Sequence, residues 1–504
     1  MAAPYVHAAA HRKSSSGDRP NRARGNRPPL PLLPDDALHN IFSFLHIEDA
    51  VRTSVLSRRW RSTWTSTTHL VFDGFRPRNR DPRSLDFPSL VGRVLSQCTS
   101  PTVKKLHVTN FKYRHRYRPK LDLWLHFALG RRVEDLRLWL ITDQWTRYTL
   151  PPFFYCSSWL VRLEVSWCSF RSDETIWWPC LKFLSIEDAD LDDDMLGRIF
   201  TGSPVLEFLK LGRCRYVKNI IIDSTSVKDL VLIGSKNYSY SYMGKIWAPH
   251  LLSLRVSGTW SGPWLCTHIF RLDDISSLVE AELVFSGRTS LFEWMYCNLL
   301  KELIDRLCGV PKITIGSWCW KILSSLEMKG VSSLLSKCQS LILRTPISQL
   351  HLLGIAYMLR SSQCLERLVI HLTGVPRLKF LKWGIHVQEE SKGSCNYDEE
   401  DFLCSRKESF QCLVTHLNQV EIIGFKANSL GSKHVLTLIK FLLGNTFTLE
   451  KMIIKADLRA RNGQKRLQAI LSELLAVRQN VLGYQRASKN AEIIFDFPLQ
   501  LASF

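Results

Sequence analysis

A short hydrophobic pattern recurs through most of this chain and limits what the chain can fold into. The pattern is apolar-x-x-apolar-x-apolar, and thirteen copies begin at positions 103, 133, 160, 181, 206, 227, 251, 278, 310, 338, 365, 417 and 449. Most neighbouring copies are 21 to 32 residues apart, and one step, from 365 to 417, spans 52 residues. Single copies arise by chance in any leucine-rich chain, whereas thirteen at similar spacing indicate a structural repeat.

The spacing is typical of a leucine-rich repeat, in which each unit adds one strand to a parallel sheet. The alternate apolar residues of a strand face one side and bury there, while the residues between them face the other side. We expect helical return segments at 195–200, 334–338 and 357–361. The sequence therefore predicts an α/β solenoid whose curved sheet offers a concave surface for protein binding. Tryptophans along it, including Trp177 and Trp178, fit either contact residues or internal packing.

Composition restricts the compartment and the class of partner. The formal net charge is +21 over 504 residues, which favours acidic partners without indicating a fold. Residues 1–28 are basic, polar and poor in apolar side chains, so they predict a disordered tail. They lack the apolar stretch of a secretory signal, and no run approaches 18 uninterrupted apolar residues. We therefore expect no membrane span, reduced cysteines and a nuclear and/or cytoplasmic location.

Residues 30–75 predict a small module of three helices. Pro34 and the two aspartates after it suit a helix start, and an apolar stripe follows at i, i+3, i+4 and i+7. Asp49 is a candidate N-cap for a second helix, and Ser57 for a third that carries Trp60. So small a unit buries little surface alone, so its apolar face packs either on a partner or on the solenoid. Periodicity leaves both alternatives open.

The order and spacing of this module closely resemble an F-box, especially that of plant F-box/leucine-rich-repeat proteins. The residues that carry the resemblance are Leu33–Leu38, Ile41–Leu45, Asp49–Ala50 and Ser54–Arg61. In that family the F-box docks on a Skp-type adaptor, which connects it to a cullin scaffold carrying a RING subunit. By position, the resemblance implies adaptor contacts from seven residues: Leu33, Pro34, Leu38, Ile41, Leu45, Leu56 and Trp60.

The C-terminal part predicts three strands, at 420–425, 449–454 and 491–497. Between them, helical stripes run from Val435 to Leu442 and from Leu467 to Leu475. This arrangement resembles the FBD domain that follows the repeats in many plant F-box proteins, and it would cap the open end of the solenoid. We therefore divide the chain into a tail (1–28), an F-box (29–75), leucine-rich repeats (76–405) and an FBD-like segment (406–504).

Motifs of catalysis and of metal or cofactor binding are not found in the sequence. A Walker loop, G-x-G-x-x-G, G-x-S-x-G, H-E-x-x-H and C-x-x-C are all lacking. The acidic run at 188–194 departs from a calcium loop, since Asp193 stands at the glycine position and Ile199 at the final glutamate position. We therefore expect neither an enzyme nor a metal site, and no cofactor.

Nucleic-acid binding is the alternative that the sequence leaves open. Residues 112–120 interleave cations with Tyr113 and Tyr117, as a surface for phosphates and stacked bases would. The pattern lacks the signature of a known nucleic-acid fold, so a docking site for an acidic protein target is favoured. The candidate contact patch consists of Lys112, Arg114, Arg116, Arg118 and Lys120.

The resemblance implies a substrate-recognition subunit of a Skp–cullin–F-box (SCF) type E3 ubiquitin ligase. The F-box would dock the adaptor, and the repeats would bind a target protein for ubiquitination. The alternative is a basic nucleic-acid-binding or scaffolding protein that uses the solenoid surface. No residue in the sequence identifies the target.

Overall fold

The computed structural model describes most of the 504-residue chain. The described residues are 34–56, 60–75, 86–142, 146–170, 173–234, 244–260, 271–287, 293–316, 319–331, 333–373, 398–426, 431–457 and 464–497. The predicted disordered tail at 1–28 lies outside these ranges, as does Leu33.

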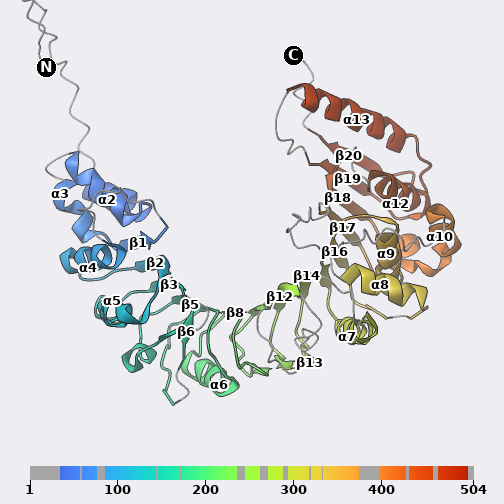
Figure 1. The fold of residues 1–504 in the computed structure, drawn as a ribbon. Helices are drawn as coiled ribbons and strands as arrows, with labels where there is room; N and C mark the ends of the chain where they lie inside the picture. Colours follow the sequence, from blue (N-terminus) through green and yellow to red (C-terminus); the bar gives the residue numbers. More distant parts are fainter. Residues whose placement is uncertain are drawn as a thin grey trace, which may run out of the picture.

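An N-terminal module of short helices opens the described chain (Figure 1). Its helices are α1 (Asp35–Ser43), α2 (Ile47–Arg52) and α3 (Trp60–Thr63), and two short 3-10 turns follow α2 and α3. The predicted N-cap of the second helix at Asp49 is wrong, because α2 begins at Ile47. Asp49 lies in the first turn of α2, where the helix dipole favours a negative charge.

The N-terminal module ends in a strand that belongs to the main sheet. β1 (His69–Asp73) pairs in parallel with β2 (Lys105–Lys112), with Leu70 opposite Leu106. The sequence pattern missed β1 because Thr67, which is almost fully buried, occupies the first of the three apolar positions. The sheet therefore starts within the segment that was predicted to be only helical.

Fifteen parallel strands form one continuous sheet along the inner side of a horseshoe (Figure 1). Each of the thirteen predicted copies falls on one strand of it, and β1 and β20 extend the sheet at its two ends. The α/β solenoid is thus confirmed. After β2 the strands are β3 (Asp135–Ile141), β5 (Arg162–Ser166), β7 (Phe183–Glu187), β8 (Phe208–Gly212), β10 (Asp229–Gly234), β12 (Ser253–Trp260), β14 (Glu280–Gly287), β15 (Lys312–Ile315), β16 (Ser340–Thr345), β17 (Arg367–Leu372), β18 (Gln419–Phe425), β19 (Lys451–Ala456) and β20 (Glu492–Asp496).

The strand register aligns the repeated apolar residues into continuous columns. Leu136 lies opposite Leu163, which lies opposite Leu184, and the column continues through every strand pair. These side chains are buried between the sheet and the outer layer, so the residues between them face the concave side. The register also continues from the copy at 278 to that at 310, with Glu280 opposite Lys312, and across the 52-residue step from 365 to 417, with Arg367 opposite Gln419.

Helices and short strands form the outer layer of the horseshoe (Figure 1). The helical returns predicted at 195–200 and 357–361 are confirmed by α6 (Asp193–Gly202) and α9 (Gln349–Ser361). The one predicted at 334–338 is wrong, because the helix of that repeat is α8 (Cys319–Met328). Gly330, with a φ of +66°, ends α8 in the left-handed turn that terminates many helices.

The remaining elements complete the outer layer and the C-terminal arm. The predicted strands of the C-terminal part are confirmed as β18, β19 and β20. Its two helical stripes lie on α12 (Ser432–Asn445) and α13 (Gln464–Leu482). The other helices are α4 (Phe87–Gln97), α5 (Arg118–Gly130), α7 (Glu293–Arg306), α10 (Glu399–Ser405) and α11 (Gln411–Thr415). The short outer strands are β4 (Tyr148–Thr149), β6 (Cys168–Ser169), β9 (Ile220–Ile221), β11 (Lys245–Trp247) and β13 (Arg271–Asp274).

Candidate adaptor-binding and target-binding surfaces

One face of the N-terminal module packs on the solenoid. Phe42, Ile47 and Ala50 are buried and belong to the same contiguous core as the residues of the sheet. The ring of Trp60 meets that of Phe42 edge to face, with centroids 6.0 Å apart. The self-packing that periodicity left open is therefore present, and it holds one apolar face of α1 and α2 against the first strand.

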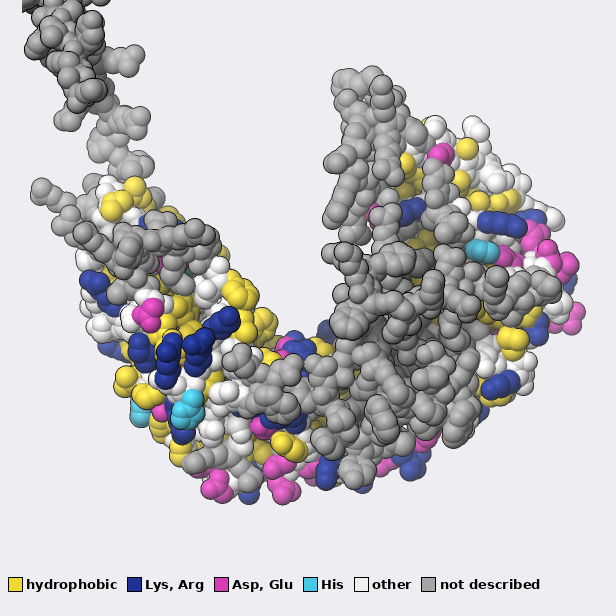
Figure 2. All heavy atoms as spheres, viewed as in Figure 1, with side chains coloured by type: hydrophobic (Ala, Val, Ile, Leu, Met, Phe, Trp, Pro, Cys, Tyr) yellow, Lys and Arg dark blue, Asp and Glu magenta, His cyan; other side chains and the backbone are white. Residues whose placement is uncertain are grey.

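Other apolar side chains of the same module remain exposed. Phe44 is 88% exposed, Val55 85%, Leu56 61% and Ile41 40%. They come from two short segments, the end of α1 and the 3-10 turn after α2. Figure 2 shows apolar side chains at the outer end of the N-terminal arm. These large exposed apolar side chains on so small a unit make the two segments a candidate interaction surface.

The predicted basic patch lies where β2 passes into α5. Lys112 ends β2, Arg114 continues in extended conformation, and Arg116 sits in the 3-10 turn before α5. These three side chains are exposed, and we call them the basic rim. The other two residues of the predicted patch have partners within the chain. Arg118 Nε lies 4.0 Å from Asp122 Oδ2, and Lys120 Nζ lies 3.5 Å from Ser89 Oγ.

The two tyrosines interleaved with the basic rim are buried to different degrees. Tyr113 is 3% exposed, and its ring packs against that of Tyr148 with centroids 5.6 Å apart. Tyr117 is partly buried against Phe111 at 5.5 Å, and Arg116 donates to its hydroxyl. The predicted arrangement of cations with exposed stacking aromatics is therefore only partly present in residues 112–120. Base stacking, on which sequence-independent single-strand binding depends, loses Tyr113 as a platform.

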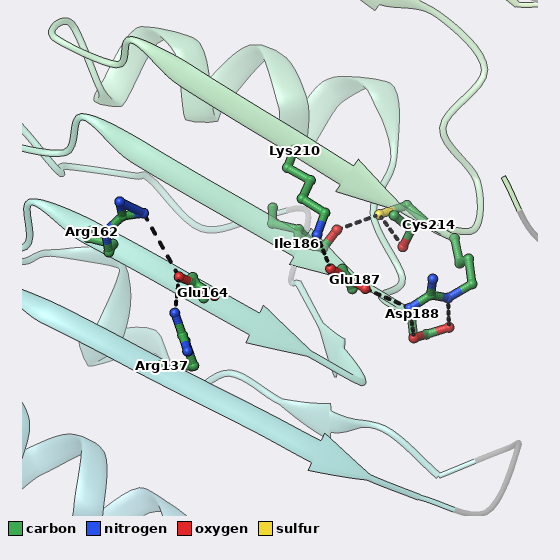
Figure 3. A network of polar contacts seen from close by, with 10 residues as sticks. Arg137, Arg162, Glu164, Ile186, Glu187, Asp188, Lys210 and Cys214 are labelled. Atoms are coloured by element: carbon green, nitrogen blue, oxygen red, sulfur yellow. Dashed lines mark hydrogen bonds and ion pairs between the residues drawn. The ribbon is translucent and has the colours of Figure 1, made fainter. Parts of the chain in front are cut away.

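Ion pairs cross from strand to strand on the concave face (Figure 3). Arg137 of β3 donates to Glu164 of β5 at 2.6 Å, and Arg162 Nη1 lies 3.9 Å from the same carboxylate oxygen. Two strands further along, Lys210 Nζ lies 2.6 Å from Glu187 Oε1. The cations of this part of the concave face are therefore balanced by carboxylates of the same or a neighbouring strand.

This series of ion pairs on the concave face, the ion-pair ladder, continues past the carboxyl ends of β7 and β8. Arg213 donates to both carboxylate oxygens of Asp188, at 2.9 Å and 2.8 Å, and to Glu187 at 2.6 Å. Arg215 forms a second bidentate pair with Asp190 at 2.6 Å and 2.9 Å. Bidentate pairs of this kind fix geometry as well as charge. They account for two aspartates of the acidic run.

Asp192 and Asp193 of the acidic run also have contacts within the chain. Asp192 caps α6, since its Oδ1 accepts from the backbone N–H of Met195 at 2.8 Å. Asp193 accepts backbone hydrogen bonds from Lys218 and Asn219. Within the described ranges, no cluster of three or more His, Cys, Asp or Glu residues is placed to hold a metal ion.

Aromatic side chains interrupt the charged ladder on the concave face. Phe183 of β7 and Phe208 of β8 stack with centroids 4.4 Å apart and nearly parallel rings. The Arg162 guanidinium lies 3.6 Å from the centroid of Phe183 on its β5 side. All three are partly exposed, so this array gives the concave face an apolar contact area among its ion pairs.

The ion-paired carboxylates of the concave face make the free energy of unfolding depend on pH. Burial alone would raise the pKa of Glu187, but hydrogen bonds and charges from Lys210 and Arg213 hold that pKa below its usual 4.5. Lys455 and Arg367 likewise outweigh burial and lower the pKa of Glu421. The unfolded chain then binds more protons than the folded one near these pKa values. The contribution of both groups is complete above about pH 5 and is lost as the pH falls through the folded pKa.

We therefore expect wild type to lose more stability between pH 5.5 and 3.5 than a Glu187→Gln/Glu421→Gln variant. The amides keep the shape of the side chains but do not titrate. Urea denaturation at several pH values measures the difference, and the gap between the two proteins should narrow as the pH falls. Parallel stability curves would contradict the role of these carboxylates.

Three family models match separate parts of the chain. They are described as "F-box domain" (residues 30–70), "FBD-associated F-box protein At5g56370, LRR repeats" (residues 121–269) and "FBD" (residues 407–454). The F-box/LRR-repeat protein At3g03360 of Arabidopsis thaliana is 31% identical over 362 residues, 68% of this chain and 70% of the relative. The chain belongs to the F-box/leucine-rich-repeat family.

Further relatives of this F-box/leucine-rich-repeat protein extend the match. The F-box/LRR-repeat protein At5g02910 of Arabidopsis thaliana is 32% identical over 347 residues, 67% of this chain and 71% of the relative. The putative F-box/LRR-repeat protein At3g18150 of the same plant is 28% identical over 437 residues, 84% of this chain and 85% of the relative. Members of the family are non-catalytic adaptors, so membership supports the assignment of no enzymatic activity.

The structure sorts six of the seven predicted adaptor contacts of the F-box into three groups. Ile41 and Leu56 are exposed, and so is Pro34 at the N-cap of α1. Leu45 and Trp60 are half-buried and pack against the core. Leu38 is fully buried, so a rigid partner docking on this surface would not reach its side chain. Leu33 lies outside the described residues.

Two exposed residues of the F-box were not predicted from the sequence. Phe44 lies three residues after Ile41, on the same side of α1, and this spacing was the available signal. Val55 precedes Leu56 in a 3-10 turn, where no helical stripe marks it.

In the parts of the chain that are described, no helix is both long and apolar enough to span a membrane.

Proposed function

We propose that this F-box/leucine-rich-repeat protein is a substrate-recognition subunit of an SCF-type E3 ubiquitin ligase. The F-box docks on a Skp-type adaptor, and the solenoid holds the target protein. The observation that carries the proposal is the exposed apolar surface of Ile41, Phe44, Val55 and Leu56 on a module whose opposite face is already packed. A module with two apolar faces, one satisfied internally, has one left for a partner.

The role of the solenoid follows from the same architecture. A target bound on the concave face is held at a fixed distance from the adaptor, and proximity to a ubiquitin-charged enzyme replaces catalysis by the receptor itself. The Phe183–Phe208 pair with Arg162 offers an apolar and cationic contact area for such a target. Aromatic and arginine side chains are the types that most often dominate protein interfaces.

Reconstitution with a purified Skp-type adaptor tests the proposal. We expect the full-length chain and the adaptor to elute together from a sizing column as a one-to-one complex. The complex should persist in about 0.5 M salt, because an apolar interface is insensitive to the screening that removes contacts between exposed charges. Separate elution in low salt, or a complex that dissociates in high salt, would contradict docking through the apolar surface.

A further inference from the structure

We infer that the basic rim, Lys112, Arg114 and Arg116, is a docking site for an acidic, extended peptide segment of the target protein. This inference rests on the proposed role of the protein as a target receptor and names the chemistry of part of that target. The segment would carry aspartate or glutamate at alternate positions. Three observations support the inference. The three cations lack carboxylate partners among the described residues, their surroundings are basic, and the backbone holds two of them at the spacing of an extended chain.

The charge of the basic rim is not balanced within the described part of the chain. Arg137, Lys210 and Arg213 pair with carboxylates of a neighbouring strand, and Arg162 lies near Glu164 of its own strand. Among the described residues, no carboxylate forms an ion pair with any of the three side chains of the basic rim. Arg116 contacts only the hydroxyl and ring of Tyr117, at 2.9 Å and 4.9 Å. As far as the described residues show, these cations are thus available to pair with an external anion.

The surroundings strengthen the positive field at this place. Residues 86–142 contain eleven Lys and Arg against four Asp and Glu. Figure 2 shows Lys and Arg side chains gathered on the N-terminal arm, below the F-box. A surface of one sign raises the local concentration of oppositely charged segments and speeds their association.

The backbone sets a spacing that an extended peptide can match. Lys112 lies in β2 and Arg114 has φ −136° and ψ 151°, so this segment is extended. Tyr113 between them is buried, which leaves Lys112 and Arg114 on the same, outward side. Alternate residues of an extended chain are about 6.6 Å apart. A peptide with acidic residues at alternate positions therefore brings its carboxylates into register with these two cations.

The same geometry disfavours nucleic acid as the occupant. Binding of a single strand combines phosphate contacts with stacking on exposed aromatics, whereas Tyr113 is buried and Tyr117 is half-buried and contacted by Arg116. The rim is also short, with three exposed cations rather than a continuous basic groove. An acidic protein segment needs only the charges and their spacing, and both are present.

Binding of a defined peptide by the full-length protein tests this inference. The probe is a fluorescent twelve-residue peptide of alternating Glu and Ser, and fluorescence anisotropy measures its dissociation constant. We expect saturable binding that weakens as salt rises. A Lys112→Glu/Arg114→Glu/Arg116→Glu variant should bind at least about tenfold more weakly, because three ion pairs become repulsive contacts.

A charge-matched variant provides the control. Lys104→Glu/Lys329→Glu/Lys489→Glu changes the net charge equally at exposed positions outside the basic rim. It should bind the peptide within about twofold of wild type. Equal weakening by both triple variants would overturn the inference, since net charge alone would then explain binding. Tighter binding of a twelve-nucleotide single-stranded DNA than of the peptide would overturn it in favour of nucleic acid.

The outcome is separable from that of the proposed function. The rim variant should still form the complex with the Skp-type adaptor, because the basic rim lies outside the F-box. Retained adaptor binding with unchanged peptide affinity would remove only the inference about the rim. Peptide binding by a chain that does not bind the adaptor would remove only the ligase assignment.

Discussion

A chain that carries both Phe44→Asp and Val55→Asp is expected to lose its co-purification with a Skp-type adaptor. Both side chains are more than four-fifths exposed, so neither supports the core of the F-box. Buried aromatic and aliphatic anchors contribute about 2 kcal/mol or more each at an interface, and a carboxylate in their place must also be desolvated. A combined loss of about 4 kcal/mol corresponds to an affinity about a thousandfold lower.

Phe447→Asp is the matched control for this double variant. Phe447 is also an exposed phenylalanine, but it lies in the C-terminal part of the horseshoe, far along the chain from the F-box. It should leave adaptor binding unchanged. Circular dichroism and the urea midpoint should be similar for all of these proteins. Undiminished adaptor binding by the double variant would show that the exposed apolar surface is not the docking site.

Trp178→Ala is expected to lower the free energy of unfolding by about 3–5 kcal/mol, the usual cost of removing a fully buried large aromatic side chain. Its ring packs against Phe154 and Tyr155, and its indole N–H donates to the Phe154 carbonyl at 3.1 Å. The variant leaves a cavity and an unpaired carbonyl in one repeat. Urea denaturation followed by tryptophan fluorescence or circular dichroism measures the loss.

Trp177→Ala is the control, and it differs by one position in the chain. Trp177 is 54% exposed whereas Trp178 is fully buried, so its removal should change the free energy of unfolding by less than about 1 kcal/mol. Similar losses of unfolding free energy in the two variants would contradict the assignment of Trp178 to the core and of Trp177 to the surface. The pair also resolves the two interpretations of the tryptophans, since Trp178 belongs to the internal packing and Trp177 does not.

The repeating part of the fold was predictable because its signal is spread over many copies. Each repeat needs two buried residues on its strand, and this requirement leaves a pattern that thirteen units reproduce. The pattern fails where a polar residue replaces an apolar one, as Thr67 does before β1. It also fails for return segments such as α8, whose end depends on the conformation of Gly330 rather than on periodicity.

The surfaces were less predictable because they depend on which residues the fold brings together. Glu164 pairs with Arg137 and Glu187 with Lys210, and each pair joins residues more than twenty positions apart in the chain. Only the register of the sheet decides such partners. Whether Leu38 or Phe44 faces solvent depends in the same way on packing, since one lies in α1 and the other directly follows it, and both are apolar.

The pairing of β1 with β2 sets a defined distance between the F-box and each repeat of the solenoid. The F-box supplies the first strand of the sheet, and β1 is joined to β2 of the repeats by backbone hydrogen bonds. Neighbouring strands are about 4.8 Å apart, so each repeat advances the concave face by one such step and a small rotation. In the proposed complex, with the adaptor on the F-box, the repeat that holds a target would fix which of its lysines the transferring enzyme can reach. Inserting or deleting one repeat between the two proposed binding surfaces would shift that zone by one step.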